Sequence, residues 1–261
     1  MSEASPEVVF AIKDHGIALV TINRTKAGNS VSPEVTATLY EAVQRVDEDE
    51  SLRVAILTGA GDTVFCAGAD LRTVSEGRGQ ELVHPSAGFA GFVNAKPQKP
   101  WIVAVNGAAM GGGLELALTA DMVVAAEHAT FGLPEVKVGV AALAGGIYRL
   151  PRAIPRAIAM EMIATGAPIS ARRGYELGLI NRVVPADQLI EEAMGLARQI
   201  AANAPISVLE SLQLARQTYD KTEAELLDMN AAVQQRVMST EDAKEGSTAF
   251  VEKRKPVWKG R

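Results

Sequence analysis

The hydrophobic residues of the first half of the chain fall into short runs, each about as long as one β-strand. Runs 8–12 and 17–22 flank Asp14-His15-Gly16, where the glycine favours a hairpin turn. Compact apolar runs also cover 54–58, 102–105 and 122–125, and a glycine-bearing loop or a helix-like segment follows each of them. This alternation predicts an α/β fold with a parallel sheet at its core.

Helical spacing occurs once early in the chain and dominates after residue 154. Ser32 is expected to cap a helix with Pro33 in its first turn, because the apolar residues from Val35 to Val46 share one face. The later helices are predicted at 158–165, 171–177, 187–202, 207–219 and 222–238. Their apolar faces must cover either the core or a neighbouring subunit. We therefore predict a core over residues 1–202 and a helical C-terminal region over residues 203–261.

Composition and charge narrow the class of protein. The chain has 261 residues, of which 48% are hydrophobic, and this is enough for a substantial core. A net charge of −5 argues against nucleic-acid binding, and the single cysteine, Cys66, leaves no intrachain disulfide. Residues 1–6 are polar, and no apolar run reaches the ~18 residues that a membrane span needs. We predict a cytoplasmic protein that binds neither nucleic acid nor a membrane.

Three familiar ligand-binding motifs are incomplete in this sequence. Gly59-Ala60-Gly61 follows an apolar run, but Val64 stands where a dinucleotide-binding loop needs its third glycine. The run Gly107 to Gly113 resembles a phosphate loop until Leu114, which occupies the place of the lysine. The histidines, at positions 15, 84 and 128, have no metal-ligand spacing. The sequence thus predicts no metal and no nucleotide cofactor.

The most informative segment joins the glycine triplet Gly111-Gly112-Gly113 to two glutamates, Glu115 and Glu135. A glycine-rich turn that opens a helix brings bare backbone N–H groups close to a substrate, and a carboxylate one turn later can act on it. Glu115 lies among leucines and joins no charged face. We therefore expect its carboxyl to be buried, with a raised pKa suited to acid–base chemistry near neutral pH.

The remaining candidates depend on this pair. Glu135, after Pro134, on its own would read as a helix-start acid that complements the helix dipole. Asp70 is expected to be a helix N-cap, and Cys66 is expected to pack as a small apolar residue. The loop 65–71 that contains them can supply a further exposed N–H group. Together these groups predict chemistry on a carbonyl.

Several motifs in order along the chain resemble those of the enoyl-CoA hydratase/isomerase family, the crotonases. The motifs are 22–24, 29–30, 65–71, 104–107, 111–116, 131–135 and 250–255, so the resemblance covers nearly the whole chain. It implies a crotonase-like spiral of ββα units with a helical C-terminal region used in trimerisation. Such trimers commonly pair into hexamers. We therefore expect a homotrimer or a hexamer.

The resemblance also implies the ligand and the roles of the site residues. The substrate class is an acyl-CoA thioester, and no separate cofactor is expected because coenzyme A is part of the substrate. The N–H groups of Ala67 and Gly112 match the family's oxyanion hole. Ala67, Gly68, Ala69 and Asp70 match the loop along the CoA arm, with Gly112 also at the substrate. Glu115 and Glu135 match the two catalytic glutamates.

The predicted reaction is reversible hydration of an enoyl-CoA through a stabilised enolate. Glu135 would exchange a proton with the α-carbon, and Glu115 would activate the water. The alternatives are another crotonase reaction and a non-catalytic CoA-binding or RNA-binding homologue. The first includes a carnitinyl-CoA-like dehydratase, because 133–137 resembles that branch, and a double-bond isomerase, which can work with the Glu135-type residue alone.

Two parts of the predicted acyl site leave the substrate open. Leu143 and Tyr148 replace the family's usual glycine and glutamine, and we expect them to reshape the pocket near the reacting carbons. In the variable segment 76–94, Phe89 and Phe92 suit an acyl-tail wall and plain packing equally well.

Overall fold

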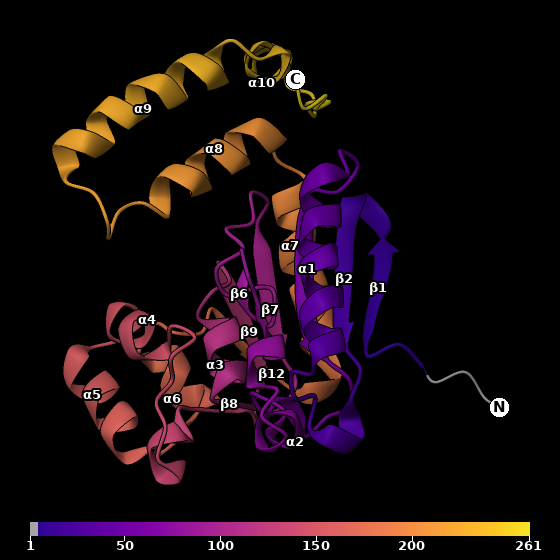
Figure 1. Cartoon of the computed structure of the whole chain (residues 1–261). Helices are drawn as coiled ribbons and strands as arrows, with labels where there is room; N and C mark the ends of the chain where they lie inside the picture. The colour runs from indigo at the N-terminus through magenta and orange to yellow at the C-terminus, as the bar shows by residue number, and fades with distance from the viewer. Residues whose placement is uncertain (1–4) are drawn as a thin grey trace.

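The computed structural model describes residues 5–261 as an α/β body with a helical arm above it (Figure 1). The strands are β1 (Val8–Lys13), β2 (Ile17–Ile22), β3 (Val54–Gly59), β4 (Val64–Cys66), β5 (Val83–His84), β6 (Gly88–Phe89), β7 (Trp101–Val105), β8 (Ala108–Met110), β9 (Met122–Ala126), β10 (Thr130–Gly132), β11 (Ile169–Ser170) and β12 (Arg182–Val184). The helices are α1 (Pro33–Glu48), α2 (Leu71–Ser75), α3 (Gly112–Ala117), α4 (Gly146–Ala153), α5 (Arg156–Thr165), α6 (Ala171–Glu176), α7 (Leu189–Ala201), α8 (Pro205–Ala215), α9 (Glu223–Met238) and α10 (Glu241–Glu252).

Two sheets organise the body. The larger has the order β1-β2-β3-β7-β9-β12, in which only the β1–β2 hairpin is antiparallel. The smaller has the order β11-β10-β8-β4, with β10, β8 and β4 parallel to one another. The predicted hairpin and the predicted parallel α/β core are both confirmed. The smaller sheet was not predicted, because strands of three residues are too short to show alternation.

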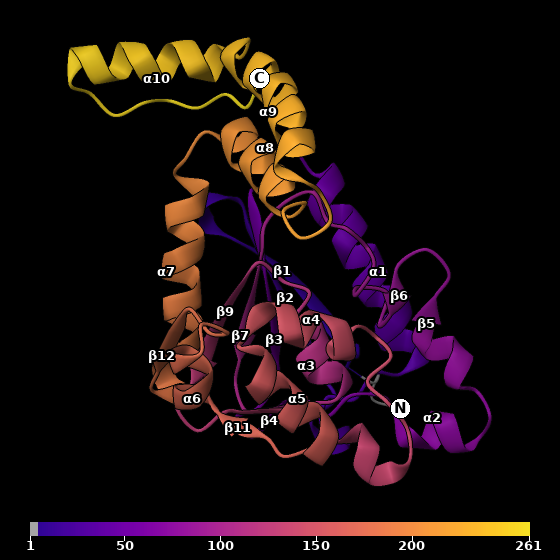
Figure 2. The same ribbon diagram turned by 90° about the vertical axis from the view of Figure 1, so that its left-hand side faces the viewer.

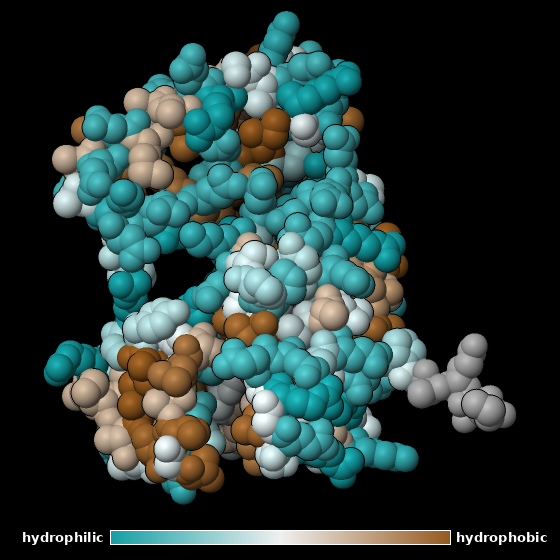
Figure 3. Space-filling model, in the orientation of Figure 1, coloured by the Kyte–Doolittle hydropathy of each residue, from teal (hydrophilic) through white to brown (hydrophobic). Residues whose placement is uncertain are grey.

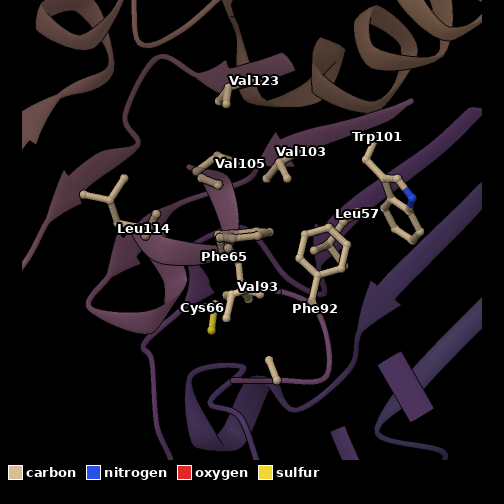
Figure 4. Close-up of a cluster of buried hydrophobic side chains, with 14 of the residues drawn as sticks. Leu57, Phe65, Cys66, Phe92, Val93, Trp101, Val103, Val105, Leu114 and Val123 are labelled. Carbon is tan, nitrogen blue, oxygen red and sulfur yellow. The ribbon is translucent and has the colours of Figure 1, made fainter. Parts of the chain in front are cut away.

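The core lies on both faces of the larger sheet. Leu57 and Val103 point into the cluster that includes α1, whereas Ile56 and Ile102 point into a second cluster with α7. Figure 2 shows α1 and α7 on opposite sides of the strands. Because helices cover both faces, β3 and β7 are buried along their whole length, which explains their unbroken apolar runs. Figure 4 shows the α1-side cluster, with Phe65 among the labelled residues.

The predicted helices are confirmed, with bounds that differ by a few residues at most. Ser32 caps α1 by accepting a hydrogen bond from the N–H of Val35 at 3.1 Å, and Pro33 is the first helical residue. Neither α4, which contains Pro151, nor α10 was predicted. Proline normally ends a helix, and α10 has few apolar residues to reveal a period.

The C-terminal arm, which consists of α8, α9 and α10, differs from the body in how its helices are buried. No residue of α8 or α9 is buried, and in Figures 1 and 2 the two helices stand away from the sheets. The division between residues 202 and 203 falls between α7 and α8, and the two-part organisation stays a prediction. Within residues 5–261, no helix is both long and apolar enough to span a bilayer. Residues 1–4, which contributed to the predicted localisation, lie outside the described part of the chain.

Candidate active site

The smaller sheet brings the predicted site segments together. Loop 67–70 follows β4, the glycine triplet with Glu115 follows β8, and Glu135 follows β10. These three strands are parallel neighbours, so their carboxyl ends meet at one edge of the sheet. Ligands of open α/β sheets bind at this kind of edge. The fold therefore assembles the site from three segments that are up to about seventy residues apart in sequence.

Glu115 is held in place at the centre of this edge. Every residue of α3 is buried, and Glu115 itself is only 3% exposed. Its Oε1 accepts a hydrogen bond from the N–H of Gly146 at 2.8 Å. Burial raises the pKa of Glu115 to about 7, and the nearby charge of Glu135 adds to the rise, while the Gly146 bond opposes it. The predicted burial and its effect on the pKa are confirmed.

Glu135 reaches the same place from a 3-10 helix, η4 (Pro134–Val138). Its carboxylate lies against Gly111, where an added Cβ would come within 3.0 Å of Glu135 Oε1. Burial raises the pKa of Glu135. Within residues 5–261 its Oε2 is buried and has no hydrogen-bond partner. No protein group in residues 5–261 therefore competes with a ligand for this oxygen.

The loop after β4 is fixed by polar contacts. Asp70 caps α2 by accepting a hydrogen bond from Arg72 N–H at 3.0 Å, as predicted, and it pairs with Arg24 at 2.9 Å. Cys66 is buried among apolar side chains (Figure 4), and this burial raises the pKa of its thiol to about 12. The thiol therefore packs and does not react, as the sequence indicated.

The structure corrects one of the two predicted oxyanion donors. The N–H of Ala67 donates a hydrogen bond to the carbonyl oxygen of Gly28 at 3.0 Å, so it is already engaged in the fold. Gly112, in contrast, is the first residue of α3, and the N–H groups of a first helical turn have no partner within their helix. Gly112 stays a candidate donor, and Ala67 does not.

Sequence reasoning missed Ala69 as a candidate donor. Gly68 has φ of +93°, and this left-handed conformation changes the direction in which the following peptide groups point. The Gly68 carbonyl and the Asp70 N–H both bond to Val31, so the Ala69 N–H between them faces the other way. It finds no acceptor in the described part of the chain. Gly68 also lies against Gly112, because an added Cβ would be 3.0 Å from the Gly112 nitrogen.

The variable segment divides its two aromatic residues between the core and the site. Phe92 is buried and packs edge to face with Trp101, with the ring centroids 5.0 Å apart. Phe89 of β6 lies against Gly112, where an added Cβ would be 2.4 Å from the ring. Only a glycine fits under this ring. The segment therefore contributes one packing residue and one wall residue.

Leu143 and Tyr148 lie on the outer side of the site. Their exposed fractions are 77% and 49%, so neither fills a closed pocket in a single chain. Figure 3 shows apolar surface gathered over α4 and α5 at the lower left. Among the residues from 5 to 261, no cluster of three or more His, Cys, Asp or Glu side chains is placed to bind a metal ion. The candidate reacting groups are backbone N–H groups and the carboxyls of Glu115 and Glu135.

A family model described as enoyl-CoA hydratase/isomerase matches residues 13–261. The carnitinyl-CoA dehydratase of Proteus mirabilis is 42% identical, over 93% of this chain and 94% of its own. A solved enoyl-CoA hydratase from Mycobacterium tuberculosis superposes with a TM-score of 0.94 at 41% identity, over 98% of this chain and 100% of its own. A solved carnitinyl-CoA hydratase from Mycobacterium avium gives 0.79 at 42% identity, over 99% and 100%.

Proposed function

Because this chain belongs to the enoyl-CoA hydratase/isomerase family, we propose that it is an enoyl-CoA hydratase, which adds water reversibly to an α,β-unsaturated acyl-CoA thioester. The predicted crotonase fold with C-terminal helices is confirmed by the superposition, and family membership identifies a lyase that acts on acyl-CoA. The observation that carries the proposal is the pair Glu115, which is buried, and Glu135, which is half-buried, two carboxyls with raised pKa values at one sheet edge. Hydration needs two such groups, one for each carbon of the double bond.

The thioester oxygen is stabilised by backbone donors. Attack of water at the β-carbon moves negative charge onto this oxygen and forms an enolate. We assign the N–H groups of Ala69 and Gly112 as the two donors, because the Ala67 N–H is engaged with Gly28. Preorganised donors of this kind are each worth about 10²–10³ in rate. Ala67, Gly68, Ala69 and Asp70 then line the CoA arm.

The two glutamates divide the proton transfers. Glu115, held by Gly146, accepts a proton from water as the oxygen bonds to the β-carbon. Protonated Glu135 then donates its proton to the α-carbon, and the enolate collapses to the saturated thioester. Glu115 ends protonated and Glu135 ionised, and exchange with solvent resets both. Dehydration follows the same steps in reverse.

A carnitinyl-CoA-type dehydratase is the second candidate. It is favoured by the 42% identity to proteins of that name. The reacting atoms are the same, and the substrate differs by a trimethylammonium group on the γ-carbon. Aromatic faces recognise such cations, and Phe89 and Tyr148 are the aromatic residues at this edge of the site. The distinction is therefore one of acyl group, not of mechanism.

An enoyl-CoA panel tests both candidates. The panel runs from crotonyl-CoA to long-chain enoyl-CoAs and includes the γ-trimethylammonium form, and the measurement is loss of the conjugated enoyl absorbance. We expect turnover with at least one member, and none in the double variant Glu115→Gln/Glu135→Gln. Preference for the ammonium substrate would select the dehydratase. Binding of the substrates without turnover of any would reject both and favour a non-catalytic CoA-binding protein.

We propose that the protein assembles as a homotrimer or as a hexamer of two trimers. Neither α8 nor α9 contains a buried residue, and Phe250 of α10 is 86% exposed. Apolar helix faces of this kind need a partner surface. Sedimentation equilibrium measures the mass directly, and a monomer at micromolar concentration would reject the proposal.

A further inference from the structure

The side chain of Arg149 joins two walls of the site. Its Nη1 donates to the carbonyl oxygen of Ala144 at 3.0 Å, and its Nη2 donates to the carbonyl oxygen of Val93 at 2.6 Å. A longer contact of 3.4 Å reaches Asn94 Oδ1. Ala144 belongs to the turn before α4, and Val93 lies in the variable segment 76–94, which also carries Phe89. One guanidinium therefore connects the turn to that wall.

Arg149 contacts the same turn, residues 144–146, that binds the carboxylate of Glu115. Gly145 has φ of +115°, and an added Cβ there would lie 2.2 Å from Arg149 Nη1, so the guanidinium rests directly on this glycine. The N–H of Arg149 also donates to the Gly145 carbonyl at 2.8 Å. The next residue, Gly146, donates the 2.8 Å hydrogen bond to Glu115. The N–H donor that binds the Glu115 carboxylate therefore follows directly after Gly145, the glycine that Arg149 contacts.

The two shorter side-chain hydrogen bonds of Arg149 go to backbone carbonyl groups and not to a carboxylate. Within residues 5–261 Arg149 forms no salt bridge, whereas Arg152, one turn later in α4, pairs with Asp220. The guanidinium of Arg149 donates hydrogen bonds to two carbonyl groups from separate segments. It also lies 5.2 Å from the Tyr148 ring centroid. A planar fork with five N–H donors can hold two acceptors in fixed geometry, which a lysine ammonium cannot do as well.

We propose that Arg149 is a positioning residue for Glu115, which holds the 144–146 turn so that the Gly146 N–H fixes the carboxylate against the bound substrate. This inference rests on the proposed function. Through Val93 the same side chain ties the turn to the wall that carries Phe89. A displacement of about 1 Å at a catalytic group can cost about 10²-fold in rate, so a loose turn would be visible in turnover.

Three variants of the full-length protein test the proposal: Arg149→Gln, Arg149→Lys and the matched control Arg152→Gln. The first readout is amide hydrogen exchange of residues 143–147, which does not depend on activity. We expect these amides to exchange faster than in the parent in both Arg149 variants. In the control their exchange rate should not change. We also expect kcat for hydration to fall about 10–10²-fold in both, with KM changed less than about threefold.

The pH profile separates positioning from general stability. The groups whose charges act on Glu115 are Glu135 of η4 and Arg149 of α4. Both the Gly146 bond and the Arg149 charge favour the ionised carboxylate, so their loss in Arg149→Gln moves the acidic limb of kcat/KM to higher pH. Arg149→Lys keeps the charge, and we expect a smaller shift despite a similar loss of kcat. A variant that only unfolded more easily would not move the limb.

The outcomes are separable from those of the proposed function. Unchanged exchange at 143–147 with an unchanged acidic limb overturns the positioning role, and so do equal effects in Arg152→Gln. If Arg149→Gln fails to fold, the comparison of Arg149→Lys with the control decides the question in the same way. If no substrate is turned over but exchange rises only in the Arg149 variants, positioning of the turn is supported and the hydratase is rejected.

Discussion

The two glutamates of the site share a raised pKa but differ in how the fold holds them. Glu115 sits on a fully buried helix and accepts a backbone hydrogen bond from Gly146. Glu135 sits on a 3-10 turn that runs into solvent at Val138, which is 72% exposed, and its Oε2 is buried without a partner in residues 5–261. A group that orients water must be fixed, whereas a group that exchanges a proton with carbon needs an unoccupied oxygen. The difference in support therefore matches the difference in proposed role.

Replacing Glu135 should have the largest effect. In Glu135→Gln we expect kcat for hydration to fall about 10⁴-fold, because no other group can exchange the α-proton. Exchange of the α-protons of a saturated acyl-CoA into D₂O, followed by NMR, should be lost as well. The melting temperature should not fall, because Glu135 Oε2 has no hydrogen-bond partner within residues 5–261 that the substitution would break, and glutamine has nearly the same shape. Substantial remaining activity would contradict both the role and the comparison.

Replacing Glu115 should uncouple the two roles. In Glu115→Gln we expect hydration to fall about 10³-fold, while α-proton exchange by Glu135 stays within about tenfold of the parent. The glutamine oxygen can still accept the Gly146 hydrogen bond, so the fold is preserved. Equal loss of hydration and exchange would show that the glutamates act as one unit. Full retention of turnover would instead favour double-bond isomerisation.

The burial of Glu115 also predicts how stability depends on pH. Its folded pKa of about 7 lies above the ordinary value of 4.5, so the folded state binds this proton more tightly than the unfolded chain. Below pH 4.5 the carboxyl is protonated in both states and has no effect. As pH rises from 4.5 through about 7 the folded state loses stability relative to the unfolded chain, by up to about 3 kcal/mol above pH 7.

Thermal unfolding of the parent and Glu115→Gln at pH 4.5 and pH 8 measures this loss. The melting temperature of the variant should rise relative to that of the parent only at the higher pH. The exposed Glu127→Gln serves as the control and should show no such gain. A pH-independent difference would mean that Glu115 titrates normally, and the contrast with a surface carboxylate would then disappear.

The smallest effect on catalysis is expected at the exposed residues Leu143 and Val138. Leu143 precedes the turn that holds Glu115, and Val138 follows Glu135, so each marks the open end of one segment. In Leu143→Gly and Val138→Gly we expect unchanged melting temperatures and changes in kcat/KM under about tenfold, largest for long acyl chains. Steady-state kinetics over the enoyl-CoA panel checks this. A hundredfold change for crotonyl-CoA would place either side chain against the reacting carbons.

The sequence predicted those parts of the site that depend on local pattern. Leucines around Glu115 indicated burial, Asp70 had the position of an N-cap, and unbroken apolar runs indicated the sheet. The smaller sheet was not visible, because β4, β8 and β10 have three residues each. Yet this sheet is what brings the three site segments together. Motif resemblance supplied that proximity where periodicity could not.

The choice between Ala67 and Ala69 shows a different limit. Both are alanines beside the same glycine, but the Ala67 N–H bonds to Gly28, whereas the peptide group after Gly68 directs the Ala69 N–H away from Val31. A glycine takes either sign at similar cost, so sequence alone does not fix the direction of the next peptide group. The bridge made by Arg149 is equally hidden, because its two acceptors are backbone carbonyls 5 and 56 residues away.

The burial of Cys66 has a practical consequence for spectroscopy. It is the only cysteine of the chain, and its thiol has a pKa of about 12, so maleimides and similar reagents have almost no thiolate to attack at neutral pH. A cysteine placed at the exposed position 143 would therefore be labelled selectively without first removing the natural one. The native sequence is in effect a ready background for fluorescent or spin probes that report on the site while substrate binds.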